Sequence, residues 1–189
     1  MQILHFKELL YGNLLLLGCC AFYLLWWIIA FKPGGPHESG RTGLILVPAF
    51  LTGIAAIYFT IRSMGTIPVT RALFASKTLL IGGVAIYIIL LLITSLAFKR
   101  QVTTELLLII GWAVMAMSEV NVIYGAGQYG LREALIVIVV IAAAAAAAMV
   151  CYMLYYGLSE KSGYIDGMLP LIIVAVITVW LAISIRPAA

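Results

Sequence analysis

Glu119 is the residue in this sequence whose type and position most clearly indicate chemistry. It is the only Asp, Glu, Lys, Arg or His residue within six long apolar stretches. An isolated carboxylate in hydrocarbon costs several kcal/mol, so it must face other helices, pair with a cation or take up a proton. A carboxylate that exchanges protons inside a membrane is typical of pumps and transporters. A purely structural carboxylate, in an interhelical ion pair or near the lipid headgroups, is the alternative interpretation.

Four other polar residues are expected to lie near Glu119. Asn121 follows it on the same stretch, and Arg62 and Arg132 lie at the ends of two other stretches that reach the same membrane face. Tyr58 lies about one helical turn from Arg62. A site that binds a substrate or a proton is predicted from five residues: Glu119, Arg62, Asn121, Tyr58 and Arg132. In this site Glu119 would pair with Arg62 or with Arg132, and no residue is assigned a catalytic role.

The histidines and cysteines indicate neither a metal site nor a cofactor. The two histidines, His5 and His37, are expected on opposite sides of the membrane, and the apolar stretches contain no histidine that could hold a haem. Cys19, Cys20 and Cys151 lie within apolar stretches, where they are expected to serve as small packing residues. The sequence also has no zinc-protease, nucleophile-elbow or P-loop motif. We therefore expect no metal and no cofactor. A non-catalytic protein is the favoured interpretation, and a membrane enzyme is the remaining alternative.

The six apolar stretches are the elements that must position these residues. They cover residues 9–31, 43–61, 78–98, 106–124, 134–158 and 167–185. Each has about the 20 residues that a helix needs to cross roughly 30 Å of hydrocarbon. Only 10% of the residues are charged, far fewer than a water-soluble surface carries. We predict an all-α, polytopic integral membrane protein, with six transmembrane helices in a compact bundle and a single membrane domain over residues 1–189.

Prolines predict three local features of these helices. Pro48 is expected to kink the second helix, because it removes a backbone donor and clashes with the carbonyl of Leu44. Pro68 is expected to restart a helix that runs over residues 68–98, with its first turns among the lipid headgroups. Asp166 is expected to cap the last helix, with Pro170 in its first turn.

The distribution of Lys and Arg residues bears on how the protein is oriented in the membrane. With six spans, both termini lie on one side, where six of the eleven Lys and Arg residues would be found. Because the other side has five, the positive-inside rule gives little preference. We place both termini in the cytoplasm and the protein in the plasma (inner) membrane. The cations are too scattered to bind nucleic acid.

Two classes of function fit this composition. The first is a small transporter or channel for a small solute or ion, including a proton-coupled one. The second is a non-catalytic membrane subunit of a larger transporter or membrane complex, because a chain with almost no loops depends on a partner for its chemistry. The expected partners are the lipid bilayer and either other membrane subunits or further copies of this chain.

Overall fold

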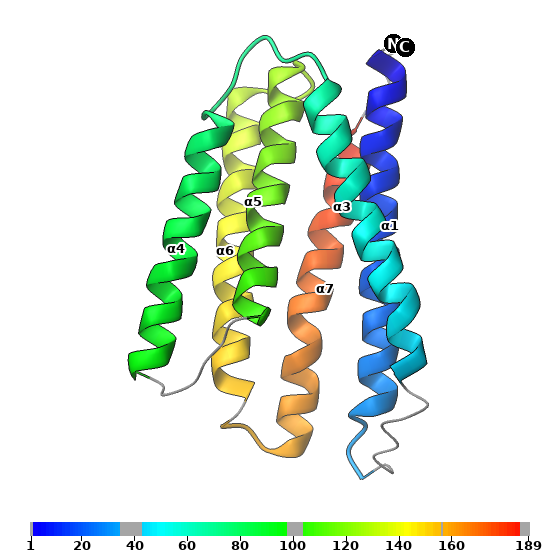
Figure 1. Cartoon of the computed structure of the whole chain (residues 1–189), viewed down its shortest axis with the longest axis vertical. Coiled ribbons are helices and arrows are strands. Elements are labelled where there is room, and N and C mark those ends of the chain that lie inside the picture. Colours follow the sequence, from blue (N-terminus) through cyan, green and yellow to red (C-terminus); the bar gives the residue numbers. More distant parts are fainter. Residues whose placement is uncertain (1, 35–42, 98–103, 156, 186–189) are drawn as a thin grey trace. The chain divides into compact units, whose positions relative to one another are not determined.

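The computed structural model describes residues 2–34, 43–97, 104–155 and 157–185, and every regular element within these ranges is a helix. The elements are α1 (Gln2–Ala30), the short 3₁₀ helix η1 (Gly43–Ile45), α3 (Leu46–Thr66), α4 (Ser76–Ala97), α5 (Thr104–Gly125), α6 (Leu131–Tyr155) and α7 (Glu160–Ser184), as Figure 1 shows. In this described part of the chain, six helices are long and apolar enough to cross a membrane. The predicted all-α class with six spanning helices is therefore confirmed.

The chain divides into two compact units. The first unit comprises residues 1–68 and 150–189, and it contains α1, η1, α3, the whole of α7 and the last turns of α6. The second unit comprises residues 69–149, with α4, α5 and most of α6. That the whole of 1–189 forms one membrane domain stays a prediction.

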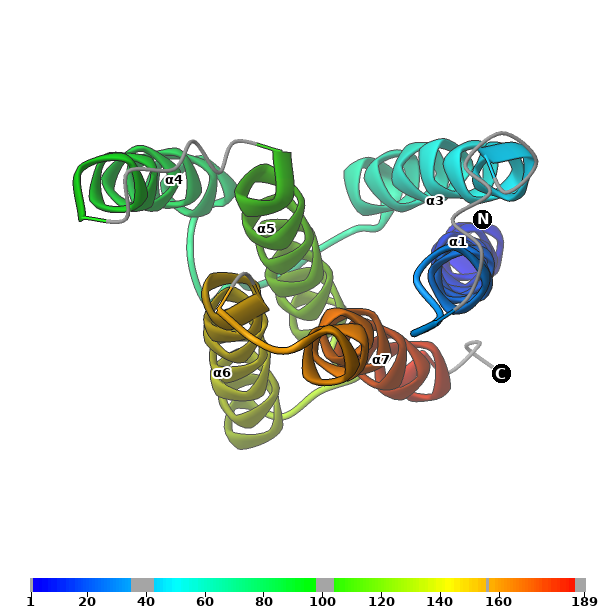
Figure 2. The same cartoon turned by 90° about the horizontal axis from the view of Figure 1, so that it is seen from below.

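In the first unit, α1 packs against α3 through small residues. A Cβ atom added to Gly12 would collide with the hydroxyl of Thr60 and would lie 3.4 Å from the carbonyl oxygen of Ala56. Farther along the same pair of helices, a Cβ on Gly53 would lie 3.2 Å from the sulfur of Cys19. Small residues at these points let the two backbones approach closely, as is common between membrane helices. Figures 1 and 2 both show α1 and α3 side by side.

On another part of its surface, α1 packs against α7. The indole N–H of Trp27 donates a hydrogen bond of 3.0 Å to the carbonyl oxygen of Tyr164. Gly167 leaves room for the indole ring, which a Cβ at that position would overlap. Trp27 also contacts the ring of Tyr155 at the end of α6, with 5.7 Å between centroids. The two helices run antiparallel, so the Gln2 end of α1 and the Ser184 end of α7 lie at the same end of this unit (Figure 1).

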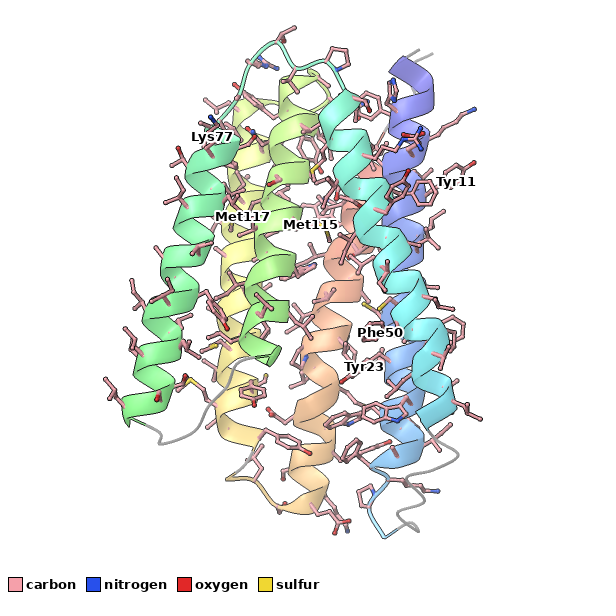
Figure 3. The ribbon with its side chains drawn as sticks, viewed as in Figure 1. Tyr11, Tyr23, Phe50, Lys77, Met115 and Met117 are labelled. Atoms are coloured by element: carbon pink, nitrogen blue, oxygen red, sulfur yellow. The ribbon has the colours of Figure 1, made fainter. Side chains whose placement is uncertain are left out.

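In the second unit, α4 packs against α5. Gly83 faces Val114 so closely that an added Cβ would lie 2.5 Å from a valine methyl group. Half of the α5 span is buried, against 11% to 28% of the other spans. Figure 3 shows two of its side chains, Met115 and Met117, and Lys77 near the start of α4. The span with the largest buried share is thus α5, which also carries Glu119.

Of the expectations drawn from Pro48 and Pro68, the second is wrong and the first stays a prediction. Because α3 begins at Leu46, directly after η1, Pro48 lies in the first turn of the α-helix. Backbone N–H groups of that turn have no intrahelical acceptor, so proline fits there. Residues 67–75 are not helical, and α4 begins only at Ser76. Pro68 therefore belongs to a connecting segment and does not restart a helix.

The expectation for the last helix is also wrong. α7 begins at Glu160, where the hydroxyl of Ser159 accepts a 3.4 Å hydrogen bond from the N–H of Ser162. This serine is the N-cap, a role for which its residue type is well suited. Asp166 is consequently buried inside the helix, and Pro170 lies in the helix interior. The apolar stretch marked where hydrocarbon begins, whereas the helix itself starts in the more polar residues before it.

Candidate functional site

Glu119 is buried in the last third of α5, with 3% of its surface exposed. It lies about 9 Å from the end of the helix at Gly125, given a rise of 1.5 Å per residue. The preceding residue, Ser118, donates a 2.8 Å hydrogen bond to the carbonyl of Val114 on its own helix. The acid is therefore held inside the protein and away from lipid, in the most buried of the six spans.

Asn121, one of the predicted binding residues, is engaged by the backbone of this chain. Its side-chain oxygen accepts a 2.8 Å hydrogen bond from the N–H of Leu73, and its side-chain nitrogen donates one of 3.2 Å to the carbonyl of Phe74. The side-chain amide thus forms hydrogen bonds with backbone groups of the non-helical segment 67–75, as the backbone of a neighbouring strand would. Asn121 fastens this connecting segment to α5, a role that the sequence prediction did not include.

Arg71 contributes to the same attachment. Its Nε donates a 3.3 Å hydrogen bond to the carbonyl of Tyr124, and its guanidinium carbon lies 4.4 Å from the centre of the Tyr124 ring. One of its terminal nitrogens also lies 3.5 Å from the carbonyl of Tyr129. The N–H and the hydroxyl of Thr70 both donate to the carbonyl of Gly125 at 3.1 Å. A cation at a helix C-terminus is favourable, so Arg71 helps to hold the segment 67–75 at the end of α5.

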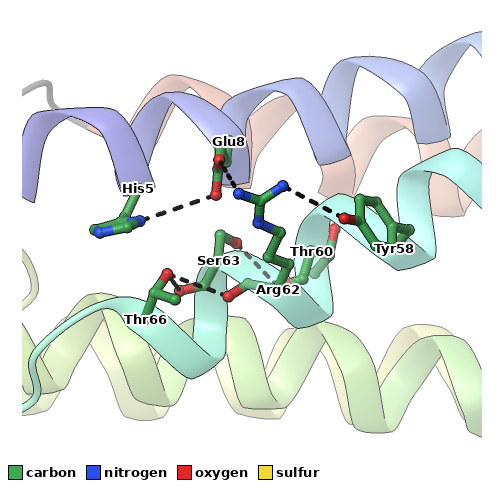
Figure 4. Close-up of polar contacts among 7 residues, drawn as sticks. All are labelled: His5, Glu8, Tyr58, Thr60, Arg62, Ser63 and Thr66. Atoms are coloured by element: carbon green, nitrogen blue, oxygen red, sulfur yellow. Dashed lines mark hydrogen bonds and ion pairs between the residues drawn. The ribbon is translucent and has the colours of Figure 1, made fainter.

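Arg62 and Tyr58, both predicted site residues, are in contact on α3, and an acid from α1 completes their group (Figure 4). The guanidinium of Arg62 donates a 3.3 Å hydrogen bond to the hydroxyl of Tyr58 and lies 3.6 Å from a carboxylate oxygen of Glu8. The other oxygen of Glu8 lies 3.9 Å from Nδ1 of His5. Glu8 was missed as a site residue because it precedes the first apolar stretch, although α1 begins well before it.

The predicted ion pairs of Glu119 stay predictions. Arg62 belongs to the first unit and Glu119 to the second, and the contacts of Arg62 within its own unit are with Glu8 and Tyr58. Arg132 is exposed at the start of α6. Beside it, Glu133 accepts a 2.9 Å hydrogen bond from the N–H of Gly130 and so stabilises the first turn of that helix.

The ion pair between Glu8 and Arg62 should contribute modestly to stability. The arginine side chain is 52% exposed and the glutamate 13%, so solvent weakens their attraction. In a double-mutant cycle with Glu8→Gln and Arg62→Gln, we expect a coupling free energy of about 0.5–1 kcal/mol. The cycle is measured from unfolding midpoints of the purified protein in detergent. Additive effects of the two substitutions would contradict the pairing.

The six apolar spanning helices define an integral membrane protein. No protein-family model matches the chain, and neither the curated proteins nor the solved structures include a similar one. Among the residues that the structure describes, no three His, Cys, Asp or Glu side chains gather in a way that could hold a metal ion. The function must therefore be inferred from the polar groups inside the two units.

Proposed function

We propose that this protein is a small transporter or channel for a small ion or solute, in which Glu119 binds the proton or cation that moves. The observation that carries the proposal is the burial of Glu119, which is 3% exposed within a membrane-spanning helix. A carboxylate in such a place is expensive to maintain, and such residues commonly mark ion or proton pathways. The free-energy cost of burying this carboxylate is explained if Glu119 binds the transported proton or cation.

The test uses the purified full chain in liposomes that enclose a pH-sensitive dye. Inward gradients of Na⁺ or K⁺ are imposed at constant membrane potential, and the internal pH is followed. We expect the wild-type protein to change the internal pH faster than protein-free liposomes do. Glu119→Gln keeps the size of the side chain but cannot ionise, so it should reduce this flux to the level of protein-free liposomes.

Glu133→Gln is the matched control for this experiment. It makes the same chemical change on an exposed acid of the second unit, and glutamine keeps an oxygen that can accept the N–H of Gly130. We expect its flux to equal that of the wild type. Equal fluxes for Glu119→Gln and the wild type, with both proteins folded, would exclude Glu119 as the coupling residue.

A second candidate function is a non-catalytic subunit of a larger membrane complex. The observation that favours it is that three of the predicted binding residues already have partners in this chain: Asn121, Arg62 and Tyr58. Polar groups engaged in this way stabilise the fold and are less available to a solute. Gentle purification from native membranes separates the two proposals, because a subunit should retain a partner in fixed stoichiometry and a transporter of the first kind should not.

A further inference from the structure

Another buried acid lies in the first two turns of α7, one residue before the apolar stretch 167–185. Asp166 is 9% exposed and lies about 9 Å from the start of the helix at Glu160, at 1.5 Å per residue. The thiol of Cys151, near the end of α6, lies beside this carboxylate. A thiol is a weak donor, so it compensates little of the cost of burying a charged carboxylate.

The other carboxylate oxygen of Asp166, Oδ2, is buried and has no hydrogen-bond partner within the part of the chain that the structure describes. Neither of the ion pairs found among the described residues includes Asp166. Near this part of α7, Cys151 lies beside Asp166 and the indole of Trp27 lies beside Gly167, and neither side chain carries a positive charge. The buried acid therefore lacks a countercharge from these neighbours.

Pro170 adds a second electronegative group at the same residue. In an α-helix the carbonyl of Asp166 would accept the N–H of residue 170, but proline has none. This carbonyl thus loses its usual donor, and carbonyls freed in this way bind cations in the interrupted helices of membrane transporters. The side chain and the carbonyl both increase the negative potential around this turn of the helix.

We propose that Asp166 holds a small monovalent cation, Na⁺, in the first two turns of α7. A buried carboxylate with an unpartnered oxygen is neutralised by such a cation at no cost to its packing. A divalent ion is not expected, because Ca²⁺ takes six to eight oxygen ligands and no group of three acidic, histidine or cysteine side chains is found among the described residues. The inference does not rest on the transport role proposed for Glu119, since a subunit that transports nothing can hold the same cation.

The test labels the purified full chain with dicyclohexylcarbodiimide, an apolar reagent that modifies protonated carboxyl groups, and locates the adducts by peptide mass spectrometry. We expect modification at Asp166 in choline chloride. Replacing choline chloride with NaCl at constant pH and ionic strength should decrease this modification at least fivefold. The absence of modification without Na⁺, or equal modification in the two salts, would overturn the proposal.

Stability in detergent gives a second readout, and Glu160→Gln, on an exposed acid of the same helix, is its control. Asp166→Asn resembles the neutralised acid, so its melting temperature should be no lower than that of the wild type and should not change between choline chloride and NaCl. A Na⁺ site should raise the melting temperature of the wild type and of Glu160→Gln in NaCl, because a ligand stabilises the state that binds it. A melting temperature several degrees lower for Asp166→Asn would show a charged, structural carboxylate and overturn the proposal.

Discussion

Replacing Gly12 with alanine should lower the free energy of unfolding by about 2–3 kcal/mol, the upper part of the usual range for overpacked sites. The added Cβ would collide with the hydroxyl of Thr60 and would lie 3.1 Å from the backbone nitrogen of the same residue. A rotation of the threonine side chain can relieve the first contact, whereas the second involves the backbone. The α1 and α3 helices would have to move apart, and the contacts along their whole length would weaken.

Gly82→Ala is the matched control, because an added Cβ on Gly82 would find no atom of a neighbouring element within 4 Å. Alanine is the better helix former, so this change should be neutral or stabilising by up to about 1 kcal/mol. Both variants are compared with the wild type by thermal unfolding in the same detergent. If Gly12→Ala were as stable as Gly82→Ala, the close approach of α1 and α3 would be incorrect.

Replacing Asn121 with leucine should lower the free energy of unfolding by about 2–4 kcal/mol. Leucine is of similar size but leaves the N–H of Leu73 and the carbonyl of Phe74 without their partners, and each such loss costs about 1–3 kcal/mol when the group is buried. The two residues are only partly buried, which keeps the cost below the sum of two full losses. We also expect the segment 67–75 to become more sensitive to proteases.

Ser118→Ala is the control for this prediction. Among the described residues, its hydroxyl bonds the carbonyl of Val114, one turn back on its own helix, so its loss should change stability by less than about 0.5 kcal/mol. Thermal unfolding and limited proteolysis of both variants check the expectation. An Asn121→Leu protein with normal stability but no flux in liposomes would instead support a substrate-binding role for this residue.

The number and approximate positions of the helices could be predicted because they depend on one property of the chain. Backbone groups in hydrocarbon must bond internally, so each long apolar stretch becomes a helix. The stretch 106–124 lies within α5, and 78–98 matches α4 to within about two residues where the structure describes it. The predicted ends of the helices were less accurate where a helix continues beyond its apolar stretch. An example is α1, which starts at Gln2 and not at residue 9.

The wrong prediction for residues 67–75 and the omission of Glu8 had a different origin. Both depend on side chains that contact distant parts of the chain. The segment 67–75 is kept out of the helix by hydrogen bonds to Asn121 and to the end of α5, about 50 residues away. Such a contact leaves no periodic pattern in the sequence. Glu8 was overlooked for a similar reason, because its value as a partner of Arg62 depends on which two helices lie side by side.

The candidate site was only partly accessible to sequence reasoning. The scarcity of acids in the apolar stretches identified Glu119, and helical spacing identified the contact between Tyr58 and Arg62. Asp166 was mistaken for a cap because it stands one residue before an apolar stretch and has a residue type that suits a helix start. Only the serine cap at residue 159 reveals that this acid lies inside the helix.

The contact between Trp27 and Tyr164 has a consequence for the order in which the protein is made. Its two partners are 137 residues apart, so at 5–20 residues per second the ribosome takes on the order of ten seconds to supply the second after the first. In that interval α3, which follows α1 directly, is already available to pair with it. The surface of α1 that carries Trp27 gains its partner on α7 only after α4, α5 and α6 have been synthesised, so the first unit is completed after the whole of the second.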